Sequence, residues 1–457
     1  MLSRTHDLDM VNGPLFGKIL IFALPIMAMN ILQLLFNAAD MVVVGRFSGS
    51  EALAAVGATG SLINLIVNLF MGLSVGTSVV VAQDYGARKV EEIRQSVHTS
   101  ITVSIIGGLI VTVAGIVLCR PLLQWMGTPD DIIHLSERYM KIYFLGMPAS
   151  MVYNFGAAIL RAVGDSRRPM YFLTISGIVN VIFNLFFVMA LHMGVAGVAW
   201  ATVISQYLAM VLIMVCLARN EGALRFSIHR LGIDGTKLKE IVRIGLPAGL
   251  QGLLFSISNV LIQSAVNSFG SVMVAASAAS GNVEGLIGTT MNSYYNAAIT
   301  FTGQNMGAKK YDRIDSIAKV VTILIFATWI VVGGGILLFG RQLLSLYTTN
   351  PEVVELGLLR LKVMMSLYFL GGIMNVFPGL TRAMGYSILP MLSTLFGACI
   401  MRIVWLATVF TWYPTVMGLF LCYPVTWGIA GLGQVASFFY ARKQVRLQNV
   451  GEATLAQ

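Results

Sequence analysis

The stretch MNILQLLFNAADMVVVG, Met29 to Gly45, has the apolar composition of a membrane-spanning helix but carries four strongly polar side chains. These are Asn30, Gln33, Asn37 and Asp40. Their spacings of three, four and three residues place them on one face of an α-helix, because neighbours on a helical surface recur at i+3 and i+4. The pattern predicts a membrane span whose polar face lines a cavity rather than lipid.

The composition of the whole chain agrees with a membrane protein. Its 457 residues are 57% hydrophobic and 11% charged, whereas about 25% of the residues of a soluble protein are charged. A span needs about 20 mainly apolar residues. The sequence offers twelve candidates, which start near residues 18, 52, 97, 137, 169, 194, 240, 272, 316, 355, 388 and 415. We therefore expect an all-α integral membrane protein with twelve transmembrane helices.

The net charge of +10 is distributed unevenly between alternate loops. The loops on the side of both termini hold 22 Lys and Arg residues, the opposite side holds seven, and Arg402 lies inside a span. By the positive-inside rule, both termini of this multi-pass protein are expected on the cytoplasmic side of the cell (inner or plasma) membrane. The basic balance then reflects topology, and we expect no nucleic-acid partner.

Three motifs of the first half return in the second half. FALPIMAM, VAQDYGARK and LRAVGDSRRP recur as IGLPAGLQ, TGQNMGAKK and LTRAMGYSILP, and matching positions such as Gln83 and Gln304 are 221 residues apart. Because six spans return the chain to its starting side, two six-span repeats are parallel. The predicted organisation is an N-lobe over residues 1–217, a cytoplasmic linker over 218–239, a C-lobe over 240–440 and a cytoplasmic tail over 441–457.

Motifs of common enzyme classes are absent from the sequence. It contains no GxxxxGK[ST] or HExxH, which argues against nucleotide hydrolysis and zinc proteolysis. The four cysteines have no CxxC spacing and the five histidines are scattered, so no metal site is expected. We predict a protein that is not an enzyme and has no cofactor, and whose transport would draw on an ion gradient.

Ion coupling needs a group that changes charge or ligates a cation inside the membrane. Two of the acids, Asp40 and Glu284, lie within apolar runs, where a carboxylate is costly and marks a functional site by default. With Pro25 aligned to Pro247, Asp40 matches Ile262, so the two halves do not share this acid. We therefore place ion coupling in the N-lobe. The alternative is that Asp40 only reaches the outer interface.

Two asparagines of the first half are further candidates for this site. Asn180 and Asn184 in IVNVIFNLFF are four residues apart and share a helical face. Their carboxamides can ligate a cation or bond to a protonated carboxyl group. The alternative is that they form polar contacts between helices.

The paired motifs, the LP early in spans 1 and 7, and the two six-span halves resemble the multidrug and toxic compound extrusion (MATE) family over roughly residues 15–440. The resemblance implies a V-shaped exporter that expels amphipathic, often cationic compounds in exchange for protons or sodium ions. It also implies an N-lobe ion site, made here by Asp40, Asn154, Asn180, Asn184 and Thr202. Relatives often have Asp at the second span-5 position, where this chain has Asn184. The missing charge favours proton coupling, with sodium at the same site as the alternative.

The C-lobe contributes two charges near the middle of spans, Glu284 and Arg402. Charges in membranes pair or face water, so we expect these two to be coupled directly or through a shared polar pocket, with a purely structural ion pair as the alternative. The 25 methionines would suit an adaptable apolar cavity. The residues predicted to face the substrate cavity are Gln33, Asn37, Gln251, Asn259, Glu284, Tyr294, Tyr295 and Arg402.

The resulting functional prediction is a secondary active multidrug efflux transporter. We expect it to exchange cations for amphipathic or cationic small molecules and to work as a monomer in the lipid bilayer. The alternative is a lipid-linked saccharide flippase of related architecture. Its phosphate-bearing substrate would require several Arg or Lys side chains inside the cavity.

Overall fold

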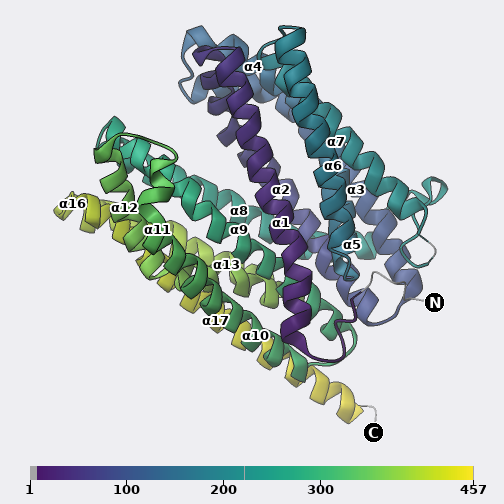
Figure 1. The fold of residues 1–457 in the computed structure, drawn as a ribbon. Helices are drawn as coiled ribbons and strands as arrows, with labels where there is room; N and C mark the ends of the chain where they lie inside the picture. The colour runs from purple at the N-terminus through teal and green to yellow at the C-terminus, as the bar shows by residue number, and fades with distance from the viewer. Residues whose placement is uncertain (1–7, 221, 456–457) are drawn as a thin grey trace. The chain divides into compact units, whose positions relative to one another are not determined.

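The computed structural model describes residues 8–220 and 222–455, and this part of the chain is helical, with no β-strand (Figure 1). The first half forms α1 (Leu15–Phe47), α2 (Ser50–Gly86), α3 (Val90–Trp125), α4 (Asp130–Leu145), α5 (Met147–Ala162), α6 (Arg167–Leu185) and α7 (Val195–Ala218). The second half forms α8 (Gly235–Asn267), α9 (Ser271–Gly307), α10 (Asp312–Thr328), α11 (Gly334–Ser345), α12 (Pro351–Ser366), α13 (Tyr368–Ala383), α14 (Ile388–Thr394), α15 (Met401–Ala407), α16 (Val409–Trp412) and α17 (Val416–Leu455). The predicted all-α membrane fold is confirmed.

Among the described helices, nine are long and apolar enough to cross a membrane. A tenth span arises if α4 and α5, which are bent by 48° at a short break, are taken together. The helices α9, α12 and α13 are outside this set. They correspond in the repeat to helices of the first half, and α12 carries Glu355, Arg360 and Lys362, which lower its hydropathy. The count of twelve spans therefore stays a prediction.

The internal repeat extends to the helix boundaries and the backbone conformation. Both ends of α2 and α9 are 221 residues apart, as are both ends of α5 and α13. The residues with positive φ also repeat at this interval, in the pairs Gly49 and Gly270, Arg88 and Lys309, and Gly164 and Gly385. A non-glycine residue in the left-handed region is uncommon, so the pair Arg88 and Lys309 is a specific mark of duplication.

By packing, the described chain divides into two compact units whose borders differ from those predicted. Unit 1 contains Leu24–Gly249, and unit 2 contains Met10–Ala23 and Leu250–Gln457. The start of α1 thus belongs to unit 2, and the first half of α8, together with the predicted linker, belongs to unit 1. The sequence repeat places the borders near residues 217 and 240. These borders differ because a repeat marks the duplicated segment of sequence, whereas a compact unit is defined by which helices pack together.

Glycines allow two helices of unit 1 to approach closely. A Cβ atom added to Gly76 of α2 would lie 2.2 Å from the Ile241 carbonyl oxygen of α8, and one added to Gly72 would lie 2.1 Å from the Gly249 nitrogen. In the other direction, a Cβ on Gly245 would lie 2.6 Å from Leu73 Cα. Small residues at helix interfaces permit this backbone contact in membranes, and here they fix the first half of α8 against α2.

A buried cation anchors the start of α8 in the same unit. Lys237 is 4% exposed, and its Nζ donates hydrogen bonds to Asp84 Oδ2 at 2.9 Å, Glu92 Oε2 at 3.1 Å and Glu240 Oε2 at 3.2 Å. Asp84 also accepts a bond of 2.7 Å from Ser96 Oγ. The segment predicted as a free polar linker is therefore tied to α2 and α3, which the sequence did not indicate.

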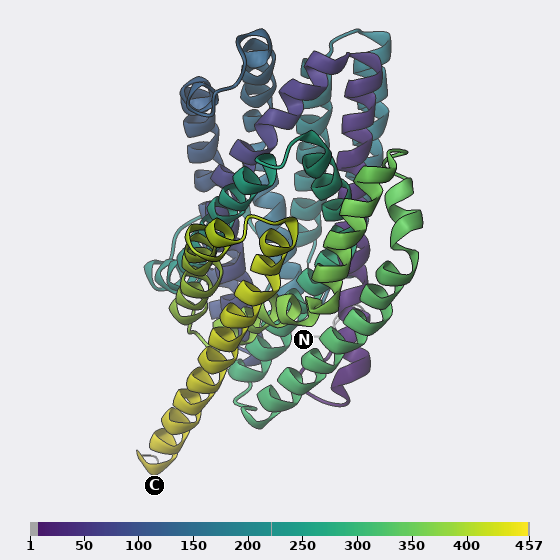
Figure 2. The same cartoon turned by 90° about the vertical axis from the view of Figure 1, so that its left-hand side faces the viewer.

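In unit 2, α13 packs against α9 and α17, and α9 also packs against α12. The segment before α1 is held by polar contacts. Asn305 Nδ2 donates to the Met10 carbonyl oxygen at 3.1 Å, and Lys310 Nζ donates to Asn12 Oδ1 at 2.6 Å. Figure 2 shows α17 as one long helix that reaches the C-terminal end, so the segment predicted as a tail continues this helix to Leu455.

The contact between α2 and α8 predicts that Gly76→Ala destabilises the fold. The added methyl group would collide with backbone, which cannot rotate away, and overpacking of this kind costs about 1–3 kcal/mol. We expect a lower yield of monodisperse protein in detergent and a lower Tm. Gly17→Ala is the matched control, because a Cβ there meets no atom within 4 Å. Equal behaviour of the two variants would contradict the packing described for Gly76.

Removal of the Lys237 charge should also destabilise unit 1. Lys237→Met removes the cation shared by Asp84, Glu92 and Glu240, of which Glu92 also pairs with Lys89, and breaking a buried ion pair costs about 3–5 kcal/mol. We expect a fall in Tm, partly reversed when Asp84→Asn is added, since that change removes one of the unpaired charges. Lys239→Met, at an exposed position of the same helix, should leave the Tm unchanged. A Lys237→Met protein as stable as the Lys239→Met protein would refute the role of the cluster.

Candidate functional site: a polar cavity in unit 1

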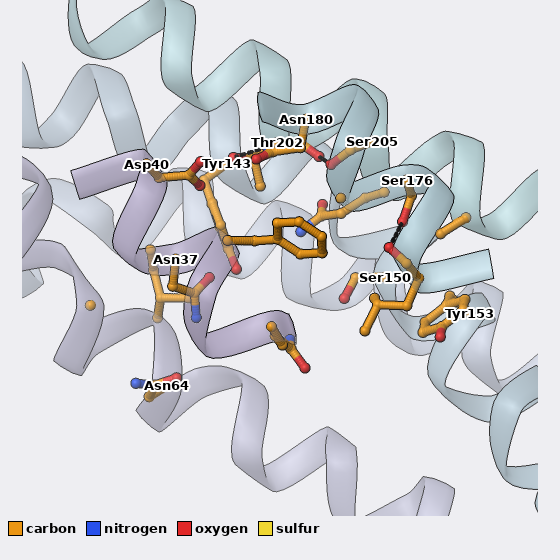
Figure 3. A pocket seen from close by; sticks show the side chains of 18 of the residues that line it. Asn37, Asp40, Asn64, Tyr143, Ser150, Tyr153, Ser176, Asn180, Thr202 and Ser205 are labelled. Carbon is orange, nitrogen blue, oxygen red and sulfur yellow. Dashed lines mark hydrogen bonds between the residues drawn. The ribbon is translucent and has the colours of Figure 1, made fainter. Parts of the chain in front are cut away.

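Unit 1 contains a cavity of about 520 Å³ (Figure 3). Side chains from α1, α2, α4, α5, α6 and α7 line it. Asn37 and Asp40 come from α1, and Asn64 comes from α2. The polar stripe of α1 therefore faces a cavity through Gln33, Asn37 and Asp40, as its spacing predicts, and Asp40 is partly buried.

Four of the five residues predicted to form the ion site are joined by hydrogen bonds. Asn184 Nδ2 donates to Asp40 Oδ1 and, at 3.2 Å, to Asn180 Oδ1. Asn180 Nδ2 in turn lies 3.4 Å from Thr202 Oγ1, whose hydroxyl donates to the Val198 carbonyl oxygen at 3.0 Å. This chain of contacts links α1, α6 and α7. It can form because Asn180 and Asn184 are one helical turn apart on α6.

The fifth residue, Asn154 on α5, lines the same cavity but is not part of this chain. Its Nδ2 donates to the Ser150 carbonyl oxygen at 2.8 Å. The structure therefore brings all five predicted residues into one region, and Asn154 is available on the cavity wall.

The amide of Asn184 is oriented to serve an ionised carboxylate. Its NH₂ group points to both Asp40 and Asn180, while its Oδ1 is buried without a hydrogen-bond partner. An unpartnered buried oxygen costs free energy. Rotation of the amide would present this oxygen to Asp40, and an oxygen can accept a bond only from a protonated carboxyl group.

Several residues of the cavity wall were not predicted. Ser150, Ser176, Tyr139, Tyr143 and Arg161 line it. The two serines share helical faces with predicted residues, Ser150 with Asn154 and Ser176 with Asn180, each at a spacing of four, and this signal could have identified them.

The 22 Lys and Arg residues counted in loops on the side of both termini include Arg161 and Arg382, and for these two the assignment to loops was wrong. Arg161 lies in the last turn of α5 and lines the cavity, and Arg382 lies in α13 and is 4% exposed. The sequence places both before a Gly, in segments that look like turns. Because helices α5 and α13 extend to residues 162 and 383, both arginines belong to helical walls. The remaining Lys and Arg residues still show the same asymmetry between loops.

The charges of the C-lobe have different partners from those predicted. Glu284 Oε2 lies 3.1 Å from Arg360 Nη2, so a direct pair between Glu284 and Arg402 is wrong. Arg402 is fully buried, and its Nη1 donates to Ser258 Oγ at 3.1 Å and to Asn259 Oδ1 at 2.7 Å. Both guanidinium groups lie over the ring of Tyr423, at 5.6 Å for Arg360 and 5.2 Å for Arg402. Glu284 and Arg402 therefore share a neighbour but form no pair.

The other predicted cavity residues of unit 2 also have structural partners. Arg382 donates to Gln251 Oε1 and, at 2.6 Å, to Tyr295 Oη. Tyr294 is 3% exposed and its hydroxyl lies 2.9 Å from Thr328 Oγ1. The burial of Tyr294 and Arg402 corrects their predicted place in a substrate cavity, since both side chains are packed inside the unit. None of the six unit 2 candidates lines the cavity of unit 1.

Comparison with known protein families reproduces the internal repeat. The family model described as MatE matches residues 25–186 and again residues 247–408. The two matches start 222 positions apart and together cover most of the chain. The two halves are therefore copies of one domain type.

Known proteins and solved structures align along nearly the whole chain. The probable multidrug resistance protein YoeA of Bacillus subtilis is 30% identical over 82% of this chain and 83% of its own length. The FAD transporter of Shewanella oneidensis is 24% identical over 95% and 96%. A crystal structure of MATE in complex with MaL6 has a TM-score of 0.89 at 23% identity, with 97% of this chain and 99% of that chain covered. With its polar-lined cavity, its duplicated helices and these matches, the chain belongs to the MatE family of membrane transporters.

Proposed function

We propose that the protein is a secondary active multidrug exporter, which expels amphipathic and cationic compounds in exchange for protons. The observation that carries this proposal is Asp40, a carboxylate that lines the cavity and bonds to Asn184. Among the described residues of the cavity wall it is the acidic group. A carboxylate in such a place can bind and release the ion that drives transport.

Proton binding at Asp40 would change the packing around it. The ionised form accepts a bond from the Asn184 NH₂ group, as in the structure. The protonated form would instead donate to an acceptor, and the unpartnered Oδ1 of Asn184 can supply one after rotation of the amide. Rotation would remove the bond from Asn184 to Asn180. The two protonation states therefore favour different arrangements of α1 and α6, and a gradient that shifts their populations would drive a conformational cycle.

Sodium coupling is the less favoured alternative. Sodium would need several oxygens directed at one point, as hard cations take oxygen ligands. The site has one carboxylate, Asp40, among neutral amides and a hydroxyl. This arrangement supports a proton rather than a sodium ion.

The charge of the cavity supports an exporter of small amphipaths over a flippase of lipid-linked saccharides. A substrate with several phosphates would call for several cations, whereas the described wall contains one, Arg161. Several relatives have names that agree with drug export, whereas the FAD transporter of Shewanella oneidensis is named for a substrate that carries phosphate. Probable multidrug resistance proteins of Bacillus subtilis and Thermotoga maritima are 30% and 25% identical to this chain, and the multidrug export protein MepA of Staphylococcus aureus is 22% identical.

We also propose that the protein lies in the cell membrane as a monomer, with both termini and residues 218–239 on the cytoplasmic side. The uneven distribution of Lys and Arg between alternate loops supports this orientation. Asp40 then lies toward the outer end of α1.

The central test is Asp40→Asn in proteoliposomes. The variant keeps the size of the side chain but cannot change charge, so we expect it to insert and fold normally and to lose proton-driven dye export by at least about 10-fold, the size of effect typical of a lost proton-transfer group. The measurement is efflux of a fluorescent cation at an imposed pH gradient, normalised to inserted protein. Sodium gradients of equal size, without a pH gradient, separate the two coupling ions.

Asp131→Asn serves as the control, because this exposed acid lies at the start of α4, outside the cavity. It should export at the wild-type rate. If Asp40→Asn exports like the control with an unchanged pH dependence, Asp40 is not the coupling group. If only a sodium gradient drives the wild type, coupling is to sodium.

The orientation is tested by cysteine labelling in intact cells. In a background without the four native cysteines, we expect Asp130→Cys to react with an impermeant thiol reagent and Arg230→Cys to react only after lysis. The reason is that Asp130 begins α4 and Arg230 precedes α8, on opposite sides of the proposed topology. Labelling of position 230 and not of 130 from outside would reverse the orientation.

A further inference from the structure

We propose that Arg161 forms an anion-binding subsite of the unit 1 cavity, which holds the carboxylate or another acidic group of a transported amphipath. The inference rests on the proposed export function. It specifies that the transported compounds include zwitterions with an acidic group as well as simple cations. The proposal stands on the position of Arg161, on its lack of an anionic partner and on a comparison with its counterpart in the other repeat.

Arg161 lines the cavity from the last turn of α5. Its Nε is buried and makes no hydrogen bond. Within the described residues no carboxylate lies at ion-pair distance from it. The nearest acid in sequence, Asp165, is engaged elsewhere, since it pairs with the Arg168 side chain and accepts bonds of 3.1 Å from the backbone nitrogens of Arg167 and Arg168.

The repeat supplies an internal reference for this arginine. In the equivalent residue of unit 2, Arg382, the Nε is buried without a partner as in Arg161, but both Nη atoms donate hydrogen bonds, to Tyr295 and Gln251. In the alignment of the two repeats, Gln251 matches Met29 of unit 1 and Tyr295 matches Ser74. A thioether is a weak acceptor, and the Ser74 hydroxyl donates to the Met71 carbonyl oxygen at 2.7 Å. Unit 1 thus has the arginine but neither of the two side chains that accept hydrogen bonds from its counterpart in unit 2.

A guanidinium group in a cavity wall is well suited to a carboxylate. Charged groups away from bulk water are normally paired, and the planar fork of Arg binds carboxylate or phosphate through two parallel hydrogen bonds. The described neighbour with an electrostatic link to Arg161 is the phenol of Tyr153, which is neutral at physiological pH and leaves the positive charge uncompensated. A substrate anion would supply the missing charge.

Asp40 and Arg161 lie toward opposite ends of the cavity. Tyr153, the neighbour of Arg161, contacts Met29 of α1 through its hydroxyl, 3.8 Å from the sulfur. Asp40 is eleven residues further along α1, roughly 16 Å at the rise of an α-helix. Figure 3 shows Asp40 and Tyr153 far apart across the pocket. The cavity is therefore bipolar, and an amphipath with an acidic end would be oriented with that end at Arg161.

A pair of dyes that differ in one group tests the proposal. Rhodamine 110 has a free carboxyl group, and rhodamine 123 is its methyl ester. We would measure binding of each dye to purified protein in detergent by fluorescence polarisation, without any ion gradient. We expect Arg161→Gln to weaken rhodamine 110 binding by about 10-fold or more, the usual effect of losing a hydrogen bond to a charged group, and to change rhodamine 123 binding by less than about 2-fold. Arg161→Lys should lie between wild type and Arg161→Gln for rhodamine 110.

Arg167→Gln is the matched control, because Arg167 is exposed and lies at the start of α6. It removes the same charge six residues away and should leave both affinities unchanged. An equal loss of both dyes in Arg161→Gln would assign Arg161 a structural role and overturn the subsite. Unchanged rhodamine 110 binding would overturn it as well.

The binding assay separates this inference from the proposed function. If wild-type vesicles transport neither dye under a proton or sodium gradient, the exporter proposal fails. A carboxylate-dependent difference in binding at Arg161 would still establish the subsite in that case. Conversely, a gradient could drive export of both dyes while Arg161→Gln leaves rhodamine 110 binding unchanged. This result would support the exporter proposal and refute the subsite.

Discussion

A carboxylate inside an apolar helix must find hydrogen-bond donors or water, and this constraint shapes unit 1. Asp40 satisfies it through Asn184, which is held by Asn180, which in turn reaches Thr202. Three helices are therefore positioned relative to one another by polar contacts around a single acid. The close contacts of Gly72 and Gly76 with α8 and the buried Lys237 cluster hold the other helices of the unit. The cavity is what remains where the polar faces meet without filling the space between them.

Periodicity predicted much of this arrangement. The stripe on α1 and the pair on α6 are local patterns, because residues three or four apart share a face whatever the rest of the fold does. The ion-pair partners of buried charges were harder to predict from the sequence. Glu284 was expected near Arg402 because both lie within spans of one half, but Arg360 in α12 lies closer. Such choices depend on which helices are neighbours and how they are rotated. The same holds for Lys237, whose three acidic partners are up to 153 residues away.

The sequence after Arg161 and Arg382 resembles a turn, and this led to a wrong prediction for both side chains. Arg161 and Arg382 precede short segments with glycine at positive φ, Gly164 and Gly385, and so were assigned to loops. The helices extend to the residue after each arginine. Boundaries of helices are the least reliable part of any reading of sequence, and here a shift of a few residues separates a surface charge from a charge in a cavity wall.

The two repeats have the same backbone fold but different buried charged groups. The backbone is preserved down to the left-handed residues Arg88 and Lys309, while the buried charges differ. Unit 1 has an acid on α1 and an arginine without a partner. Unit 2 has neutral Ile262 at the position of Asp40, and its arginines 360, 382 and 402 bond to Glu284, Gln251, Tyr295, Ser258 and Asn259. The two repeats thus share a backbone, while their interior polar groups make different contacts.

Neither compact unit is a continuous piece of chain, since α1 begins in unit 2 and α8 begins in unit 1. During synthesis, the first unit therefore lacks its own last helix until residue 249 has left the ribosome, well after its seventh helix is complete. Until then Asp84 and Glu92 lack their bonds to Lys237, and Gly72 and Gly76 of α2 lack the helix that packs against them. The first residues of α1, in turn, must wait for the second half of the protein before they reach their final neighbours. Membrane insertion and folding of this transporter are thus coupled across both halves, and a polypeptide cut between the repeats would divide each unit rather than separate the two.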